Sequence, residues 1–220
     1  MSFGVLVRKD LLVEARGRDA FAALLTVAVL VALVGNVAFS GLATAPVRTA
    51  AVLWTAIAFG AQVGLARSFV VEREQGTLEG LLAGPVAASA MFWSKLVANL
   101  LVLVLVGIVT LLAAAIFFAL PLDVRLLRVL VLLVPGAIGI ALVTTLAAAI
   151  AVHGRNWILL VPLLALPALF PVIAVAVPGS ALALGEAPLV ALLPHLRLVL
   201  AYDVVMAAAA WVLVPFLLEP

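Results

Sequence analysis

Residues 156–185 form an unbroken run of 30 residues without a charged side chain. Four further charge-free runs occupy 20–47, 49–66, 96–122 and 129–152, and the run 198–218 contains a single charge, Asp203. A helix needs about 20 predominantly apolar residues to cross the hydrocarbon core of a bilayer. Each run is long enough for one crossing, so the sequence predicts six.

The composition excludes most soluble classes of protein. Apolar residues make up 68% of the chain and charged residues 10%, whereas soluble domains carry about 25% charged residues. A soluble domain of this length could not cover so much apolar side chain with so little polar surface. The formal charge of +2, from 12 basic and 10 acidic residues, is too balanced for a nucleic-acid binder. The chain has no cysteine, which excludes thiol chemistry and thiolate metal sites.

These features predict an all-α membrane protein that forms a single transmembrane domain over 1–220. Backbone polar groups in lipid must be satisfied within the segment, and no alternating segments typical of a barrel are present, so the spans are expected to be helices. Four prolines, the last of them Pro178, interrupt the fifth run, so we expect a kinked helix to about Val177 and a non-helical or re-entrant outer segment over 179–194. The six predicted spans are 20–42, 48–66, 96–120, 129–152, 156–177 and 198–218.

Lysine and arginine in the connecting segments predict the orientation. Eight lie on the side that holds the N-terminal segment: Arg8, Lys9, Arg16, Arg18, Arg67, Arg73, Lys95 and Arg155. Four lie on the other side: Arg48, Arg125, Arg128 and Arg197. Because cytoplasmic segments carry the excess of basic residues, we expect both termini in the cytoplasm and a multi-pass protein of a bacterial inner membrane.

Few polar side chains fall within the predicted spans. We expect Asn36 and Gln62 to form hydrogen bonds between helices, the alternative being a place on a translocation path. Asp203 is expected near the outer interface, paired with Arg197; the alternative is a functional intramembrane carboxylate, as in an ion-coupled carrier. Among the tryptophans, Trp54 is expected at a membrane interface, as belt residues are.

The segment 67–95 contains six of the chain's 22 charges and joins the second and third predicted spans. Gly76 divides two short helical pieces, and Thr77 can cap the second. Leu78, Leu81 and Leu82 follow at helical spacing on one face of that piece. Membrane-surface helices carry basic residues on their polar face, but the helical part of this segment, 72–82, is acidic on balance, with three glutamates and one arginine. An acidic helix with a leucine stripe favours a groove on a partner protein, although a solvated surface helix remains the alternative.

Two motifs in this chain resemble those of the CcmB family. The first reads Glu72-x-Glu74-x-Gly76-Thr77-Leu78-Glu79-x-Leu81-Leu82-x-x-Pro85, preceded by Arg67-x-Phe69. The second, Lys9-Asp10-Leu11-x-x-Glu14-x-Arg16, is similar to the family's N-terminal helix. The family comprises membrane subunits of an ABC transporter complex for c-type cytochrome maturation, described as haem exporters.

The resemblance implies an ABC-2-type permease architecture, with an N-terminal cytoplasmic helix over 1–19 and a coupling helix within 67–95. It implies as partners a cytoplasmic ABC ATPase, a second copy of the chain and other cytochrome-maturation membrane proteins. The sequence contains no G-x-x-x-x-G-K-[ST] loop, so we expect no enzyme activity here and ATP hydrolysis on the separate partner. The residues expected to couple to it are Glu72, Glu74, Gly76, Leu78, Glu79, Leu81 and Leu82.

Haem enters as a possible substrate, and we expect no cofactor bound by this chain. Haem iron takes an axial His, Met, Cys or Tyr, and the chain has only two histidines, His153 and His195. Neither lies in a sequence environment that gathers further ligands. Export of haem and release of a haem-loaded chaperone are therefore both compatible with the sequence.

Three alternative functions remain open. One is an ABC-2 exporter of another amphiphile, such as a lipid or a drug. A second is a membrane scaffold that docks partner helices without transporting anything. A third is an ion-coupled carrier that uses Asp203, for which more intramembrane carboxylates would be expected.

Overall fold

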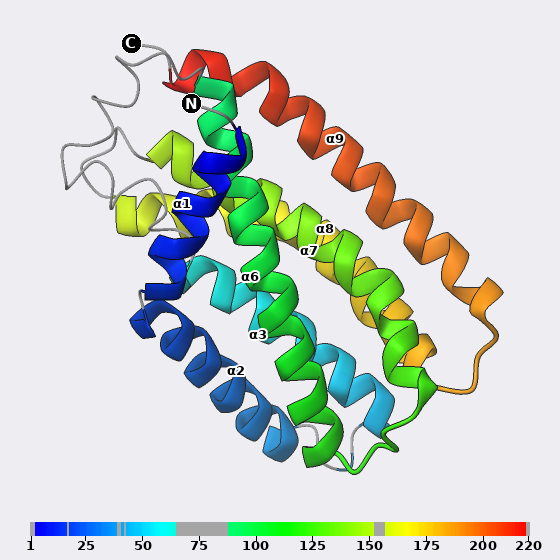
Figure 1. Cartoon of the computed structure of the whole chain (residues 1–220). Helices are drawn as coiled ribbons and strands as arrows, with labels where there is room; N and C mark the ends of the chain where they lie inside the picture. Colours follow the sequence, from blue (N-terminus) through cyan, green and yellow to red (C-terminus); the bar gives the residue numbers. More distant parts are fainter. Residues whose placement is uncertain are drawn as a thin grey trace.

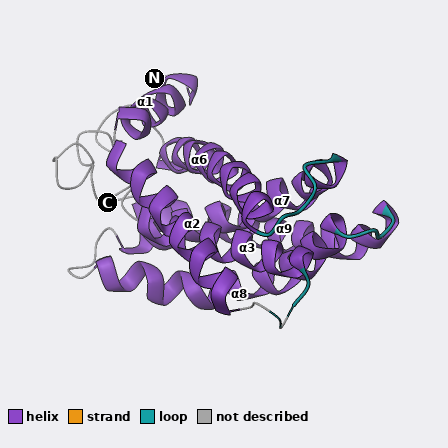
Figure 2. Ribbon diagram, turned by 90° about the horizontal axis from the view of Figure 1, so that it is seen from below, coloured by secondary structure: helices purple, strands orange, loops and turns teal. Residues whose placement is uncertain are grey.

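The computed structural model describes residues 3–16, 18–38, 41, 43–64, 88–151 and 157–218. Within these residues the regular structure is helical throughout and contains no strand, which confirms the all-helical prediction (Figure 2). The elements are α1 (Phe3–Arg16), α2 (Arg18–Ala38), α3 (Ala45–Gly64), α6 (Ala88–Phe117), α7 (Val124–Ala151), α8 (Trp157–Leu184), a 3-10 turn η2 (Leu189–Leu192) and α9 (Leu193–Leu218).

Four of the described helices are long and apolar enough to cross a membrane. They cover Ser89–Phe117, Val124–Ala151, Leu160–Leu184 and Leu189–Leu217, which correspond to the third to sixth predicted spans. Helices α2 and α3 occupy the places of the first two, with 21 and 20 residues, but are not among the four. The chain is thus an integral membrane protein.

Helix α7 is the central helix of the bundle and packs against α6, α8 and α9 (Figure 1). Every residue from 139 to 149 in it is buried. Small side chains dominate this stretch, from Gly139 to Ala149, and small residues let neighbouring helix backbones approach closely in a membrane. The stretch from Gly139 to Ala149 is therefore buried on every side, as expected of a helix enclosed by others.

The prediction for the fifth run was wrong beyond residue 177, because α8 remains helical to Leu184. Pro167, Pro171 and Pro178 lie within the helix at relative positions i, i+4 and i+11, which share one face, and all three are exposed. Membrane helices tolerate such prolines when local adjustments satisfy the freed carbonyls. The link to α9 is short, and the expected non-helical or re-entrant segment over 179–194 is replaced by helix on both sides of a turn.

Helices α6, α7 and α9 begin earlier than their predicted spans, α7 at Val124 rather than at 129. Helix α6 starts at Ala88 rather than at 96, so Lys95 belongs to the helix and not to the loop before it. Helix α9 starts at Leu193 rather than at 198, directly after η2. The charged residues Lys95 and Arg197 marked the predicted ends, but helices continue through single charges whenever the backbone remains hydrogen-bonded.

The described contacts define two opposite ends of the bundle. At one end, α1 contacts the start of α6, and the last turns of α9 lie beside Ser89 and Trp93. At the other end, Arg125 at the start of α7 lies 3.6 Å from Glu186, after the end of α8. Figure 1 shows the long helices running side by side between these ends.

Candidate functional site

The residues expected to couple to an ATPase lie outside the described residues, as do the side chains of Glu14, Arg16 and Asn36. The described structure does place the two helices that the segment 65–87 joins. Helix α3 ends at Gly64 and α6 begins at Ala88. The contacts that fix the beginning of α6 belong to the described residues.

A polar cluster joins the N-terminal helix α1 to the start of α6. The hydroxyl of Ser94 donates to Oδ2 of Asp10 at 3.0 Å, and the Lys95 ammonium lies 3.6 Å from Oδ1 of the same carboxylate. Lys9 lies 3.2 Å from that oxygen as well. The cluster therefore unites two residues of the N-terminal motif, Lys9 and Asp10, with Ser94 and Lys95, which the sequence did not indicate as site residues.

The cluster is enclosed by protein. The Lys95 side chain is 5% exposed and that of Asp10 is 9% exposed, whereas Lys9 is 35% exposed. Leu6, one turn before Asp10 and so on the same face of α1, is 1% exposed. A buried charge is tolerated where it is paired and hydrogen-bonded. Asp10 and Lys95 meet that condition through each other, so α1 has a specific docking position.

A second polar group lies in the middle of the bundle. Asp203 is 7% exposed, and neither of its carboxylate oxygens has a hydrogen-bond partner among the described residues. A Cβ added to Gly139 would lie 2.6 Å from Asp203 Oδ1, so the glycine in α7 makes room for the carboxylate. The neighbouring Tyr202 hydroxyl donates to the Ala168 carbonyl of α8. Asp203 is thus enclosed between helices.

The expected pairing of Asp203 with Arg197 was wrong. Six residues separate the two, which places them on different faces of the helix, and Arg197 is exposed. Helix α9 begins at Leu193, so Asp203 lies ten residues into the helix, or about 15 Å along it at roughly 1.5 Å per residue. The interfacial depth of Asp203 stays a prediction.

The expectation for Gln62 was also wrong within the described part of the chain. Gln62 is 8% exposed, and neither its amide nitrogen nor its amide oxygen has a partner there. A side-chain amide does form a hydrogen bond between helices, but it belongs to Asn99 of α6, which donates to the Thr145 hydroxyl of α7 at 2.9 Å. Both residues lie in apolar runs, and a search for every amide or hydroxyl in the spans would have found them.

Trp54 was expected at a membrane interface and lies in the core instead, with no exposed surface. Its indole Nε1 donates to the Ser180 hydroxyl of α8 at 2.9 Å. The ring lies against Gly136 of α7, where an added Cβ would approach Cη2 to 2.2 Å. The position of Trp54 in the sequence suggested a residue at the membrane interface. Its buried partner Ser180 and its contact with Gly136 show instead that it packs between helices.

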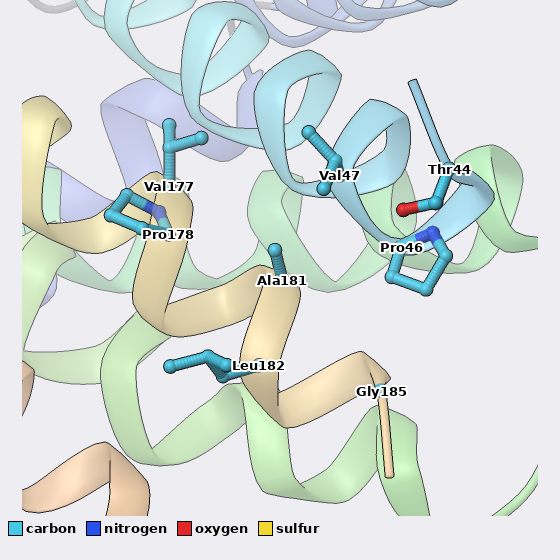
Figure 3. A pocket seen from close by; sticks show the side chains of 8 residues that line it. All are labelled: Thr44, Pro46, Val47, Val177, Pro178, Ala181, Leu182 and Gly185. Atoms are coloured by element: carbon cyan, nitrogen blue, oxygen red, sulfur yellow. The ribbon is translucent and has the colours of Figure 1, made fainter. Parts of the chain in front are cut away.

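An open apolar groove lies between the start of α3 and the end of α8 (Figure 3). Its volume is about 500 Å³. The labelled side chains show α3 contributing one wall and α8 the other. The lining residues are Thr44, Pro46, Val47, Val177, Pro178, Ala181, Leu182 and Gly185. None is charged, so the groove can offer apolar contact and little else.

Of the two histidines, His195 is described and the side chain of His153 is not. The His195 ring packs on Gly179 of α8, where an added Cβ would lie 3.1 Å from Cγ. Its Nδ1 is buried and has no hydrogen-bond partner among the described residues. In those residues no group of three or more His, Cys, Asp or Glu side chains gathers around a possible metal position.

Apolar helices packed around α7, with an N-terminal helix docked at one end of the bundle, are the features of an integral membrane protein. The chain belongs to the CcmB family: the family model, described as CcmB protein, matches residues 1–218. The resemblance noted in the sequence is therefore confirmed. The chain is a membrane permease of cytochrome c biogenesis, involved in haem export and not itself catalytic. No curated protein matches it.

Proposed function

We propose that the chain couples ATP hydrolysis on a separate ABC ATPase to the export of haem or to the release of a haem-loaded chaperone. The observation that carries this proposal is the docking of α1 on the start of α6, through Asp10, Ser94 and Lys95. It gives α6, the helix that follows the charged segment, a fixed polar attachment at one end of the bundle. A force applied to that segment can thereby reach the membrane helices.

The proposed architecture is that of an ABC-2-type permease with six spans, α2, α3, α6, α7, α8 and α9. Support comes from the positions of the helix ends, because α1 and the last turns of α9 lie at the same end of the bundle. An even number of crossings returns the chain to the side on which it started. The excess of basic residues on that side supports our proposal that it faces the cytoplasm of a bacterial inner membrane. Arg125, counted against this orientation, is paired with Asp123 and Glu186.

The ATPase contact is proposed for the acidic leucine-rich segment. Leu78, Leu81 and Leu82 would enter a groove of the ATPase, and Glu72, Glu74 and Glu79 would pair with basic residues at its rim. Gly76 would provide the break between the two helical pieces. A second copy of the chain and other cytochrome-maturation membrane proteins complete the proposed complex, in which ATP binds to the partner.

Haem is proposed as substrate, with no cofactor held by this chain. The groove between α3 and α8 contains no side chain that could bind haem iron as an axial ligand. Its apolar walls suit a hydrophobic surface without distinguishing a porphyrin from another amphiphile, so a lipid or drug exporter is the second candidate. An ion-coupled carrier has less support, because Asp203 is the one acidic residue in the described parts of the spans α3, α6, α7, α8 and α9.

Co-purification tests this proposal. The chain is expressed with the ATPase and membrane genes of its own cytochrome-maturation system and is purified through a tag on its C-terminus. We expect the ATPase to co-elute and its hydrolysis rate to depend on this chain. A chain that supports cytochrome maturation without retaining an ATPase would indicate a scaffold and contradict the proposal.

A further inference from the structure

The cluster formed by Asp10, Ser94 and Lys95 adds buried polar contacts to the apolar contacts that hold α1 against the bundle. A surface helix can be held by apolar contacts alone, and Leu6 supplies such a contact with 1% exposure. The cluster adds an ammonium and a carboxylate that are both at least nine-tenths buried. Charges at this depth stabilise one arrangement of the two helices and disfavour every arrangement that separates them.

Geometry makes the cluster specific. The two carboxylate oxygens of Asp10 have different partners, since Oδ2 accepts from the Ser94 hydroxyl at 3.0 Å and Oδ1 lies 3.6 Å from the Lys95 ammonium. Ser94 itself has no exposed surface and also lies 2.9 Å from the Met91 carbonyl, one turn earlier in α6. Sliding α1 by one turn along α6 would break both contacts with Asp10 at once. The cluster therefore sets the register of α1 as well as its docking.

We propose that Asp10, Ser94 and Lys95 are positioning residues that make α1 and the first turns of α6 one mechanical unit. This unit transmits the movement of the segment before α6 to the membrane helices. The first part, the docking of α1, stands on the structure alone. The second part, transmission, rests on the proposed function, so each part has its own measurement.

Docking can be measured by cysteine labelling because the chain contains no cysteine of its own. Leu6→Cys places a thiol on the buried face of α1, and Arg8→Cys places one on the exposed face. Each is treated with a polar maleimide in the purified, detergent-solubilised chain. In the otherwise unchanged chain, Leu6→Cys should react slowly and Arg8→Cys rapidly.

In the Lys95→Met variant the introduced thiol of Leu6→Cys should be labelled about tenfold faster or more, because the Asp10 carboxylate loses its buried cation and, of the described cations, keeps only Lys9, which is 35% exposed. The matched control is Lys9→Met, which removes a cation from the same carboxylate at a site that is 35% exposed. Water can replace an exposed partner, so labelling should rise by less than about twofold. The exchanged pair, Asp10→Lys with Lys95→Asp, restores opposite charges and should return labelling toward the original rate.

Transmission is measured in the assembled complex at matched membrane levels. Lys95→Met should retain the ATPase in co-purification but lower cytochrome maturation several-fold, and the exchanged pair should recover maturation. Unchanged protection of Leu6→Cys in Lys95→Met would overturn the docking claim, and faster labelling with full maturation would overturn the transmission claim. If the unaltered chain fails to retain any ATPase, the proposed function fails while the docking result still stands.

Discussion

The indole nitrogen of Trp54 donates a hydrogen bond of 2.9 Å to the hydroxyl of Ser180, which joins α3 to α8 across 126 positions of sequence. Both residues are fully buried. A buried indole N–H requires a partner, since leaving it unpaired costs about 1–3 kcal/mol. Gly136 of α7 borders the same ring, so one tryptophan connects three helices of the bundle.

Gly136→Ala should destabilise the protein. The new methyl group would lie 2.2 Å from Trp54 Cη2, and the ring has no exposed direction in which to move. Overpacking of this kind costs about 1–3 kcal/mol or more, so the unfolding midpoint in detergent should fall by several degrees. Gly4→Ala is the control, because an added Cβ there meets nothing within 4 Å. Equal midpoints for the two variants would show that α7 does not approach Trp54 as described.

Asp203→Asn should leave cytochrome maturation and protein level close to those of the unaltered chain. The carboxylate is buried without a hydrogen-bond partner among the described residues, and an isosteric neutral amide costs less to bury than a charge. The measurement is maturation at matched membrane levels, with Gly139→Ala as a variant that should disturb the same contact sterically. Loss of maturation in Asp203→Asn at normal protein level would instead favour the ion-coupled carrier.

Replacing both His153 and His195 by alanine should cause at most a mild defect in maturation. His195 packs on Gly179 and no group of three potential ligands surrounds it in the described residues, so it lacks the surroundings expected of a haem-iron ligand. His153 lies outside the described residues, and its sequence environment gathers no further ligand. The haem absorption spectrum of the purified double variant would test independently whether these histidines bind haem iron. Complete loss of maturation with normal protein levels would indicate direct haem ligation by this chain.

The orientation can be tested by reporter fusions placed after Pro220 and within residues 185–188. The end of α9 lies beside the start of α6, whereas the turn after α8 lies beside Arg125 at the opposite end of the bundle. The two reporters should therefore report opposite sides, with the C-terminal one in the cytoplasm. Reporters on the same side would contradict the six-span architecture.

The positions of the long helices could be predicted, because a helix that crosses lipid needs a long run of residues without charge. The four long apolar helices fall where those runs lie. Helix ends were less predictable, since a single Lys95 or Arg197 marks a polarity change without ending the backbone hydrogen bonding. The surroundings of Asp203, Gln62 and Trp54 could not be predicted, because they depend on which helices face each other and on how each helix is rotated about its axis. The contact between Asp10 and Lys95, which are 85 positions apart in the sequence, could not be predicted for the same reason.

The segment between α3 and α6 is proposed to bind an ATPase, and Leu78→Ala combined with Leu82→Ala tests this contact most directly. Apolar anchors at an interface centre contribute about 2 kcal/mol or more each, whereas rim carboxylates contribute about 0–1 kcal/mol. At matched membrane levels, the double variant should lose the ATPase in pull-down, while Glu74→Gln should weaken binding only slightly and in a salt-dependent manner. Full ATPase binding and hydrolysis in the double leucine variant would contradict the account.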